Sequence, residues 1–449
     1  MNYSVKDILK FEVSPALGCT EPTAVALGAA AAVSLLEKQK KPDHIEIRLD
    51  PNIFKNGLAV AIPGTEGKSG LDMAAALGAA AGKPELKMEV LADITERDVE
   101  KASDMLSAGK VTVHLLYDKK GLYINTRVTS GGDIAESTIE SQHDNITHLA
   151  LNGKIPGNAH VDFGGEKSGE EGGYREFEQF LKNLSVRQAA AMVDTFDIED
   201  LAFIKKGIQM NMDLAAYGLS HNCGLKVGKT FEKLVRKGFI KADVIHKARV
   251  LTSAASDARM SGASLPAMSS AGSGNHGLTA IIPVKVIADH IKSDEKDLCR
   301  AVGLSHIITA CVKSHTGRLA AICACSVASG AGAAAGAAWL LGASVEKIGN
   351  AVENIIEDLA GVICDGAKNS CALKLATASG NSLQAALFAV YDLNVKMTDG
   401  IVGETPEKTI RNIGVLSSEG MIETDRTILK IMLEKILSGD GRSCPDAAQ

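Results

Sequence analysis

The spacing of apolar positions along the chain predicts two differently built parts. Five short segments alternate or run apolar as strands do: 44–50, 58–63, 87–93, 111–117 and 122–129. Helices are predicted over 4–12, from Thr23 to Lys38 and over 69–83, and the last two strands, joined by a short polar turn, predict a hairpin. This order of elements predicts a small α/β sandwich domain over residues 1–165, with a mixed or antiparallel sheet.

After residue 175 the apolar period becomes helical and no strand is predicted. The Gly/Glu-rich segment 164–174 reads as an exposed linker between the two domains. The predicted fold class is therefore α+β, with an all-helical domain over residues 175–449 built from closely packed helices. Its predicted helices are 175–194, 198–218, 229–237, 241–259, 283–291, 295–312, 319–342, 345–360, 370–390 and 424–437.

Composition and charge favour a small-molecule protein. The chain has 449 residues with 45% hydrophobic residues, 4% aromatic residues and 44 glycines, which favours helices packed through small side chains. Its net charge is -6 and no basic stripe is present, so neither nucleic acid nor an anionic membrane is an expected partner. The start of the chain lacks a secretory pattern, so we expect a cytoplasmic protein with reduced cysteines that can form homo-oligomers. Residues 319–342 carry no charge, but their Ala, Gly, Ser and Cys content indicates a buried helix rather than a membrane span.

Four cysteines within residues 319–374 are candidate metal ligands. A C-x-C pair, Cys323 and Cys325, is followed by a C-x6-C pair, Cys364 and Cys371, a spacing that differs from that of a zinc ribbon. Thiolates in apolar surroundings suit a soft metal or an iron–sulfur cluster. The turn between Cys364 and Cys371 is polar, which would be costly to bury without a purpose. Cys299 and Cys311, by contrast, fit the pattern of small buried hydrophobes.

A second candidate lies in the Gly-Cys-Thr-Glu-Pro turn near the N-terminus. Pro22 suits the first turn of a helix, and Thr20 is a candidate cap. Cys19 therefore precedes a helix N-terminus, where partial positive charge favours a thiolate close to a substrate carboxylate. Packing of Cys19 under the turn is the equally weighted alternative. His143 and His148 are read as a polar surface or capping pair.

The Gly/Ser-rich segment 258–284 is the second chemical centre. Its hydroxyls, amides and backbone N–H groups lead into an apolar helix and predict a nest for a carboxylate or phosphate, although a plain interhelix turn is the alternative. SGNHG is similar to a phosphate loop of pyridoxal-phosphate dehydratases, but Lys241 and Lys247 lie in plain helical contexts, so that cofactor is set aside. The candidate substrate-binding residues of the nest are Ser269, Ser270, Ser273, Asn275 and His276.

Together these motifs resemble a known family. GCTEPTA, MSSAGSGNHG, CAC and ICDGAKNSCALK are similar to motifs of the L-cysteine desulfidase family over essentially the whole chain, with a more distant similarity to the iron–sulfur L-serine dehydratases. The resemblance implies a 4Fe-4S cluster on Cys323, Cys364 and Cys371, with Cys325 as the rival for the first position. Cys444, five residues before the end of the sequence, is not expected to be a ligand.

The resemblance also implies a reaction. One cluster iron without a protein ligand would act as a Lewis acid in β-elimination from L-cysteine, giving sulfide, pyruvate and ammonia. The resemblance makes Cys19 the proton acceptor, a resting ligand of the open iron, or both. Thr20 and Glu21 would assist, Glu21 by holding the substrate ammonium. An L-serine dehydratase using the same cluster, a cysteine-rich metal-stabilised binding protein and a transporter-like module remain the alternatives.

Overall fold

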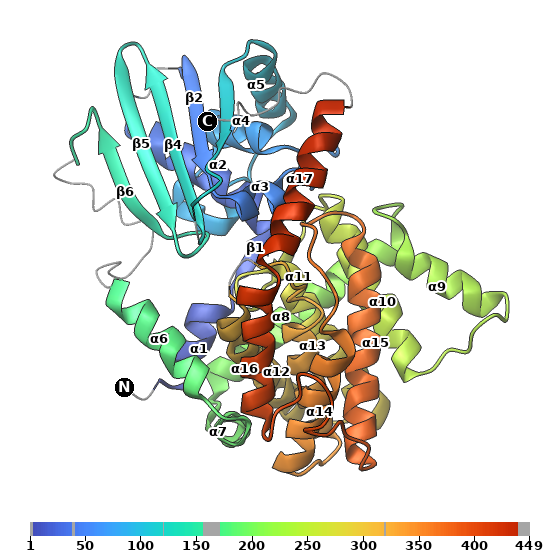
Figure 1. Cartoon of the computed structure of the whole chain (residues 1–449). Coiled ribbons are helices and arrows are strands. Elements are labelled where there is room, and N and C mark those ends of the chain that lie inside the picture. Colours follow the sequence, from blue (N-terminus) through green and yellow to red (C-terminus); the bar gives the residue numbers. More distant parts are fainter. Residues whose placement is uncertain (1–2, 38–40, 120, 156–170, 318–319, 439–449) are drawn as a thin grey trace.

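The computed structural model describes residues 3–37, 41–119, 121–155, 171–317 and 320–438. A five-stranded sheet with its helices occupies one end of the molecule, and a bundle of helices occupies the other (Figure 1). The predicted α+β class is confirmed. We call the elements from α2 to β6 the sheet part and those from α6 to α16 the helical part.

The sheet is mixed, with strand order β3-β2-β4-β5-β6. β2 pairs in parallel with β3 and antiparallel with β4, so it separates the two strands that were expected to form a hairpin, and that prediction is wrong. The tight hairpin instead joins β4 to β5 across Gly131 and Gly132, which both have positive φ. The strands are β2 (His44–Leu49), β3 (Val111–Leu115), β4 (Tyr123–Ser130), β5 (Asp133–Glu140) and β6 (Ile146–Leu151), of which β5 and β6 were not predicted.

Two predicted strands are wrong. Residues 58–63 follow helix α3 (Pro51–Gly57), which Asp50 caps by accepting hydrogen bonds from the first amides, and they form only an isolated bridge between Ala61 and Ser69. The segment 87–93 begins in a 3-10 helix, η1 (Pro84–Glu89), that is interrupted at Lys87 with φ 49°. Both segments bury apolar side chains without meeting a strand edge. A short apolar run does not distinguish that environment from a strand.

Helix α2 (Thr20–Val33) is the buried helix of the sheet part. It begins three residues before the predicted Thr23 and ends at Val33, while the predicted end at Lys38 lies outside the described residues. It packs closely on α4 (Leu71–Ala81), since a Cβ on Gly78 would lie 2.1 Å from the carbonyl oxygen of Ala26. On its other side Ser137 of β5 donates to the Gly28 carbonyl oxygen at 2.7 Å. Helix α5 (Glu96–Ser107), which was not predicted, packs on α4.

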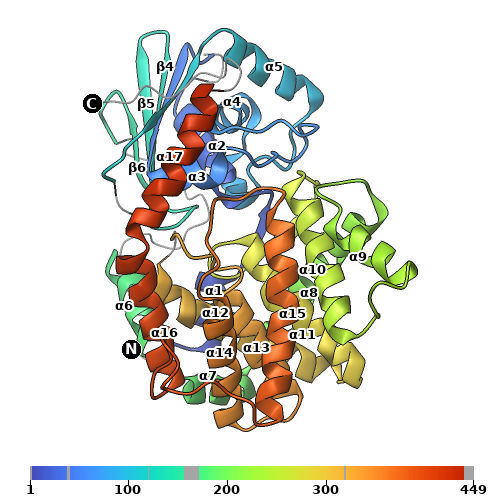
Figure 2. The same cartoon turned by 45° about the vertical axis from the view of Figure 1, so that its right-hand side comes forward.

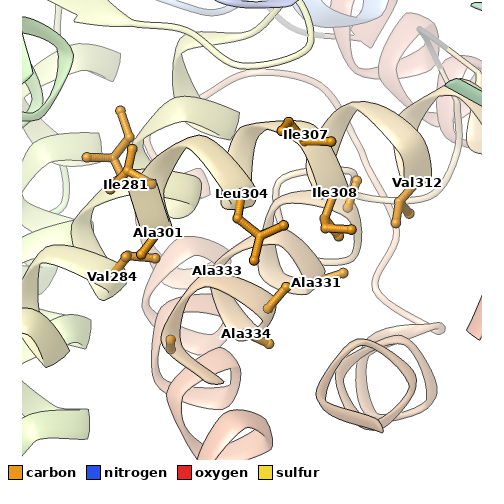
Figure 3. Close-up of a cluster of buried hydrophobic side chains, with 14 of the residues drawn as sticks. Ile281, Val284, Ala301, Leu304, Ile307, Ile308, Val312, Ala331, Ala333 and Ala334 are labelled. Carbon is orange, nitrogen blue, oxygen red and sulfur yellow. The ribbon is translucent and has the colours of Figure 1, made fainter. Parts of the chain in front are cut away.

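The helical part buries a core of small and branched side chains. Figure 3 shows Ile281 of α11, Leu304 and Ile308 of α12, and Ala331 and Ala334 of α13 meeting in this core. No helix among the described residues is long and apolar enough to cross a membrane. The helices are α6 (Glu171–Asn183), α7 (Val186–Met192), α8 (Ile198–Ser220), α9 (Val227–Arg236), α10 (Val244–Met260), α11 (Gly274–Ile291), α12 (Glu295–Thr316), α13 (Ala328–Leu340), α14 (Val345–Leu359), α15 (Cys371–Val390) and α16 (Pro406–Val415).

Three differences from the predicted helices affect the candidate site. Helix α13 begins at Ala328, not at residue 319, so the C-x-C pair lies in a turn before it. Helix α11 begins at Gly274, nine residues earlier than predicted, and Pro283 lies inside it. A three-residue strand, β7 (Pro266–Met268), interrupts the expected all-helical pattern and pairs with β1 (Pro15–Leu17). The part of the predicted linker over 171–174 belongs to α6, and 164–170 lies outside the described residues.

The first and the last helix of the described chain each pack on the part of the molecule that is distant from them in sequence. Helix α1 (Val5–Glu12) packs on α12 of the helical part. Helix α17 (Ile422–Ser438) leaves the helical part and runs along the sheet part, where Leu429 joins its core (Figure 2). There the buried ammonium of Lys55, on α3, pairs with Asp425 at 2.5 Å. A division into independent domains at residues 165 and 175 stays a prediction.

Candidate active site

One cavity of about 80 Å³, with room for several water molecules, lies where the start of α2 faces the turns of the helical part. The start of α2, α3, the end of α10, the loop before α11 and both cysteine turns contribute to its wall. Four thiols of the C-x-C and C-x6-C pairs and the thiol of Cys19 therefore share a single space. The predicted site residues that line it are Cys19, Glu21, Ser273, Asn275, His276, Cys323, Cys364 and Cys371, together with the rival Cys325.

Backbone pairing holds the two cysteine turns together. Ile322 and Ile363 form an antiparallel bridge. Beside it, the amide of Cys323 donates to the carbonyl oxygen of Val362 at 2.8 Å, and the amide of Cys364 donates to that of Ala321 at 2.5 Å. This backbone pairing brings Cys323 and Cys364, which are distant in sequence, to the same wall of the cavity.

The C-x6-C turn is anchored on both of its sides. Gly366 has φ 97°, and a Cβ there would lie 2.2 Å from the carbonyl oxygen of Lys55, so only glycine fits against α3. Cys371 is the first residue of α15. One turn further, Lys374 donates to Asp365 at 2.5 Å, which pairs two partly exposed charges of this polar turn.

The four clustered thiols differ in how readily they ionise. Burial raises the pKa of Cys364, and raises that of Cys371 to about 12. The hydrogen bond from the Cys325 thiol lowers the pKa of Cys323 to about 6, and a further hydrogen bond from Ser326 adds to this effect. The same contact raises the pKa of Cys325 well above its usual range. Within the C-x-C pair, Cys323 is therefore the acceptor and Cys325 the donor.

This donor set has the chemistry of an iron–sulfur cluster site. Among the described residues no three His, Cys, Asp or Glu side chains are gathered closely enough to hold one ion. A cluster is larger than a single ion and takes several thiolates as ligands, and four thiols of the two cysteine pairs line this cavity. Ala324, Ala367 and Leu375 add an apolar wall between the thiols. Soft ligands and such a wall are what a cluster requires.

Cys19 is the N-cap residue of α2, and Thr20 is the first residue of the helix rather than its expected cap. The Cys19 thiol donates to Oε2 of Glu21 at 3.0 Å. Burial, followed by the Glu21 charge, raises the pKa of Cys19 well above its usual range, although the charge of Arg259 opposes this rise. The expected preference for a thiolate is therefore reversed, because loss of water outweighs the partial charge of the helix end. The thiol carries its proton and points it at a carboxylate.

Glu21 accepts three hydrogen bonds within the buried cluster. Its Oε2 also accepts from the Thr20 hydroxyl at 3.0 Å, and its Oε1 accepts from Nδ2 of Asn56 at 3.0 Å. Nε2 of His143 lies 3.9 Å from Oε1. Burial opposes ionisation of Glu21, but the His143 charge and the hydrogen bonds from Cys19 and Thr20 outweigh it and lower the Glu21 pKa. Glu21 is therefore an ionised acceptor next to the Cys19 proton.

Some candidate residues of the Gly/Ser segment line the cavity, and others lie behind its wall. Ser273 is the N-cap residue of α11, and Asn275 and His276 lie in its first turn, facing the cavity. Ser269 does not line the cavity, because its hydroxyl donates to the carbonyl oxygen of Ser14 at 2.7 Å and joins β7 to β1. Ser270 is also behind the wall.

His276 presents a neutral ring to the cavity. Its Nδ1 lies 3.1 Å from the carbonyl oxygen of Ser270, which can only accept, so Nδ1 carries the proton. Burial, with the Lys313 charge, lowers the His276 pKa to about 3, so Nε2 keeps its lone pair. Behind it, Nδ1 of His306 lies 2.9 Å from the Ser270 hydroxyl, and burial lowers the His306 pKa to about 4.

Several site residues were missed from the sequence. Asn56, Arg259 and Lys313 line the cavity, and none was a candidate. Arg259 had a usable signal, since it lies at the end of a helix and directly precedes the Gly/Ser run. His143, read as a surface or capping residue, is buried against Glu21, whereas His148 is exposed on β6. Cys444 lies outside the described residues.

Thiols, an ionised carboxylate and a neutral imidazole around one cavity are groups that enzymes use for proton transfer. A family model described as the serine dehydratase alpha chain matches residues 85–430. The chain belongs to this family, that of the iron–sulfur serine dehydratases, whose members are lyases. The predicted relation to those enzymes is confirmed.

Curated relatives match nearly the whole length of the chain. A UPF0597 protein of Desulforapulum autotrophicum is 62% identical over 438 residues, covering 98% of this chain and 99% of the relative. A UPF0597 protein of Clostridium tetani is 40% identical over 430 residues, covering 96% and 98%. One from Geobacter sulfurreducens is likewise 40% identical over 430 residues, covering 96% and 98%. These relatives specify no substrate.

Proposed function

We propose that the protein is an iron–sulfur lyase that catalyses β-elimination from L-cysteine, releasing sulfide, pyruvate and ammonia. The observation that carries the proposal is that the Cys19–Glu21 pair and the three candidate cluster ligands line one buried cavity. A purely structural metal site would not need a proton-accepting pair beside it. The GCTEPTA, MSSAGSGNHG, CAC and ICDGAKNSCALK motifs support cysteine as the substrate.

Cys323, Cys364 and Cys371 are the proposed ligands of a 4Fe-4S cluster. Pairing of the 321–323 and 362–364 segments supports Cys323 over Cys325, since it brings Cys323 and Cys364 to the cavity together. With three protein ligands, such a cluster supplies an iron that can act as a Lewis acid towards the substrate.

The residues around α2 handle the proton. In the site without substrate, the pKa directions of the two groups keep this proton on Cys19. With the substrate bound, Cys19 gives the proton to Oε2 of Glu21 along the hydrogen bond of 3.0 Å, and the resulting thiolate takes the Cα proton of the substrate. The bond from Cβ to the leaving group then breaks, and the aminoacrylate product tautomerises to an imine that water hydrolyses to pyruvate and ammonia. Asn56 and Thr20 hold the Glu21 carboxylate in place by their hydrogen bonds. Before it accepts that proton, the negatively charged Glu21 attracts the substrate ammonium group.

The loop before α11 binds and orients the substrate. Ser273, Asn275 and His276 face the cavity, and the neutral His276 offers an acceptor at Nε2. Ser269 and Ser270 act from behind the wall, where their hydroxyls fix the loop to Ser14 and to His306.

L-serine is the second candidate substrate, and the matched family model favours it. The same proton-accepting pair and the same cluster would remove water rather than sulfide from the β-carbon. The two candidates differ only in the leaving group, so a direct comparison of substrates separates them.

Anaerobically reconstituted protein tests the proposal. We expect a brown protein that forms pyruvate from L-cysteine with an equal amount of sulfide. Faster pyruvate formation from L-serine would establish the dehydratase alternative. A colourless protein with tightly bound zinc and no pyruvate from either amino acid would refute catalysis and favour a metal-stabilised binding protein. In matched variants, Cys323→Ser should lose iron and Cys325→Ser should retain most of it.

A further inference from the structure

Arg259, at the end of α10, is a buried cation without a carboxylate partner. Its side chain is 2% exposed and is among the largest fully buried side chains of the described chain. Nη2 donates to the carbonyl oxygen of Gly18 at 2.6 Å, whereas Nε is buried without a hydrogen-bond partner. No ion pair joins this guanidinium to a carboxylate in the part of the chain that the structure describes. Proteins rarely bury a charge in this way unless a ligand completes it.

Other groups that favour an anion lie near Arg259 in the cavity wall, which also holds the Glu21 carboxylate. The start of α11 rests on the guanidinium, because a Cβ on Gly274 would lie only 2.4 Å from Nε of Arg259. The first-turn amides of this eighteen-residue helix therefore open beside the same group. Lys313, also buried, lines the same cavity. A second polar atom, Oδ1 of Asn275, is buried there without a partner.

We propose that Arg259 binds the carboxylate of the substrate, assisted by the amides at the start of α11. This inference rests on the proposed function and narrows its substrate class to small amino acids with a free α-carboxylate. A guanidinium with unpartnered N–H groups matches a carboxylate in charge and in planar geometry. Amides and esters of the same amino acids lack the negative charge that would pair with the Arg259 guanidinium.

The bond to Gly18 gives Arg259 a second role, which is to fix the start of α2. If Arg259 had a purely structural role, any substitution of it would weaken the binding of all ligands alike, because the whole cavity wall would loosen. A carboxylate-binding role makes the loss depend on whether the ligand has a carboxylate. The ratio of two dissociation constants therefore separates the two roles.

The test measures binding by anaerobic calorimetry with L-alanine and L-alaninamide, which have no β-leaving group and are not consumed. Wild-type protein should bind L-alanine about tenfold to a hundredfold more tightly than L-alaninamide, the scale of one charged hydrogen-bonded contact. In Arg259→Gln the ratio should fall to within about twofold. Arg259→Lys, which keeps the charge but loses the fork, should give an intermediate ratio.

Gly274→Ala provides a second variant in case Arg259→Gln fails to fold. The new Cβ would push the guanidinium aside without removing its charge, and the ratio should fall as well. Arg249 and Gly380 are matched controls: Arg249 lies on the same helix, donates to Asn381 at 3.3 Å, and has Gly380 packed against its Nε, but it does not line the cavity. Arg249→Gln and Gly380→Ala should keep the wild-type ratio.

An unchanged ratio in Arg259→Gln and Gly274→Ala would overturn the proposal, and so would a wild-type protein that binds neither ligand. These results are distinct from failure of the proposed elimination. Absence of pyruvate together with a collapsed ratio would refute the elimination and keep the role of Arg259. Pyruvate formation together with an unchanged ratio would support the elimination and refute the role of Arg259 in carboxylate binding.

Discussion

Substituting Glu21 tests whether it and Cys19 act as one unit. Glu21→Gln keeps the size of the side chain and still allows contacts to Thr20 and Asn56, but it removes the charge that accepts the Cys19 proton. Because a lost general base usually lowers turnover by about a hundredfold or more, we expect a barrier increase of at least about 2.7 kcal/mol. Cys19→Ser should lose a similar amount, because a serine hydroxyl is too weak an acid to become the base.

The turnover of the variant that combines Cys19→Ser with Glu21→Gln tests the proton relay. If the Cys19 proton must pass to Glu21, either substitution disables the same step, and the double variant should be only slightly slower than either single variant. Independent roles would instead multiply to about ten-thousandfold, and that result would refute the proton relay. The assay is steady-state pyruvate release by anaerobically loaded protein, with iron content measured for each variant. Thr20→Val, which removes a neutral donor to Glu21, is the control and should lose less than about tenfold. Loss of iron in Cys19→Ser would assign Cys19 as a cluster ligand.

The remaining predictions concern the supports of the site. Asp425→Asn leaves the ammonium of Lys55, whose side chain is 1% exposed, without its partner and should lower the free energy of unfolding in urea by about 3 kcal/mol. Lys55→Met should cost less, because Asp425 is 24% exposed and water can solvate it; equal losses would show that burial does not set the cost. Gly366→Ala should lower iron content, since its Cβ would meet the Lys55 carbonyl oxygen at 2.2 Å, and full iron content would show that the turn adapts. Cys299→Ala and Cys311→Ala, away from the cavity, should both keep full iron content.

Periodicity predicted elements well where apolar and polar faces differ, and poorly where they do not. The helix predicted over 345–360 matches α14 within a residue, because its charged and branched positions recur with helical spacing. The segment 319–342 contains almost only small residues, so the turn that carries Cys323 and Cys325 could not be told from the helix that follows it. Strand β5 was missed because its inward positions include Ser137, whose hydroxyl donates to the Gly28 carbonyl oxygen of α2. Strand β6 was missed because it exposes Thr147 and His148 in succession and so lacks a clear alternation.

Motif chemistry predicted candidate residues that line one cavity, but their charge states depend on the folded surroundings. The spacing of the cysteines identified candidate ligands, whereas their convergence depends on the bridge between Ile322 and Ile363, a contact that local patterns do not encode. A helix N-terminus alone would favour a thiolate at Cys19. Its actual environment is nearly dry and contains the Glu21 carboxylate, and both effects favour the thiol.

The small-residue composition that defines the fold also makes the site possible. Gly277 of α11 has no room for a Cβ, which would lie 1.8 Å from the carbonyl oxygen of Met268, so this helix starts directly against strand β7. Strand β7 in turn pairs with β1, and the chain reaches Cys19 two residues after β1 ends. The start of α11 and the start of α2 are therefore fixed to each other through backbone contacts, with Arg259 bridging them at Gly18. Side-chain bulk at these contacts would separate Cys19 and Glu21 from the loop before α11, which we propose orients the substrate. An aromatic-poor, glycine-rich chain therefore suits a cavity shared by two parts of the molecule.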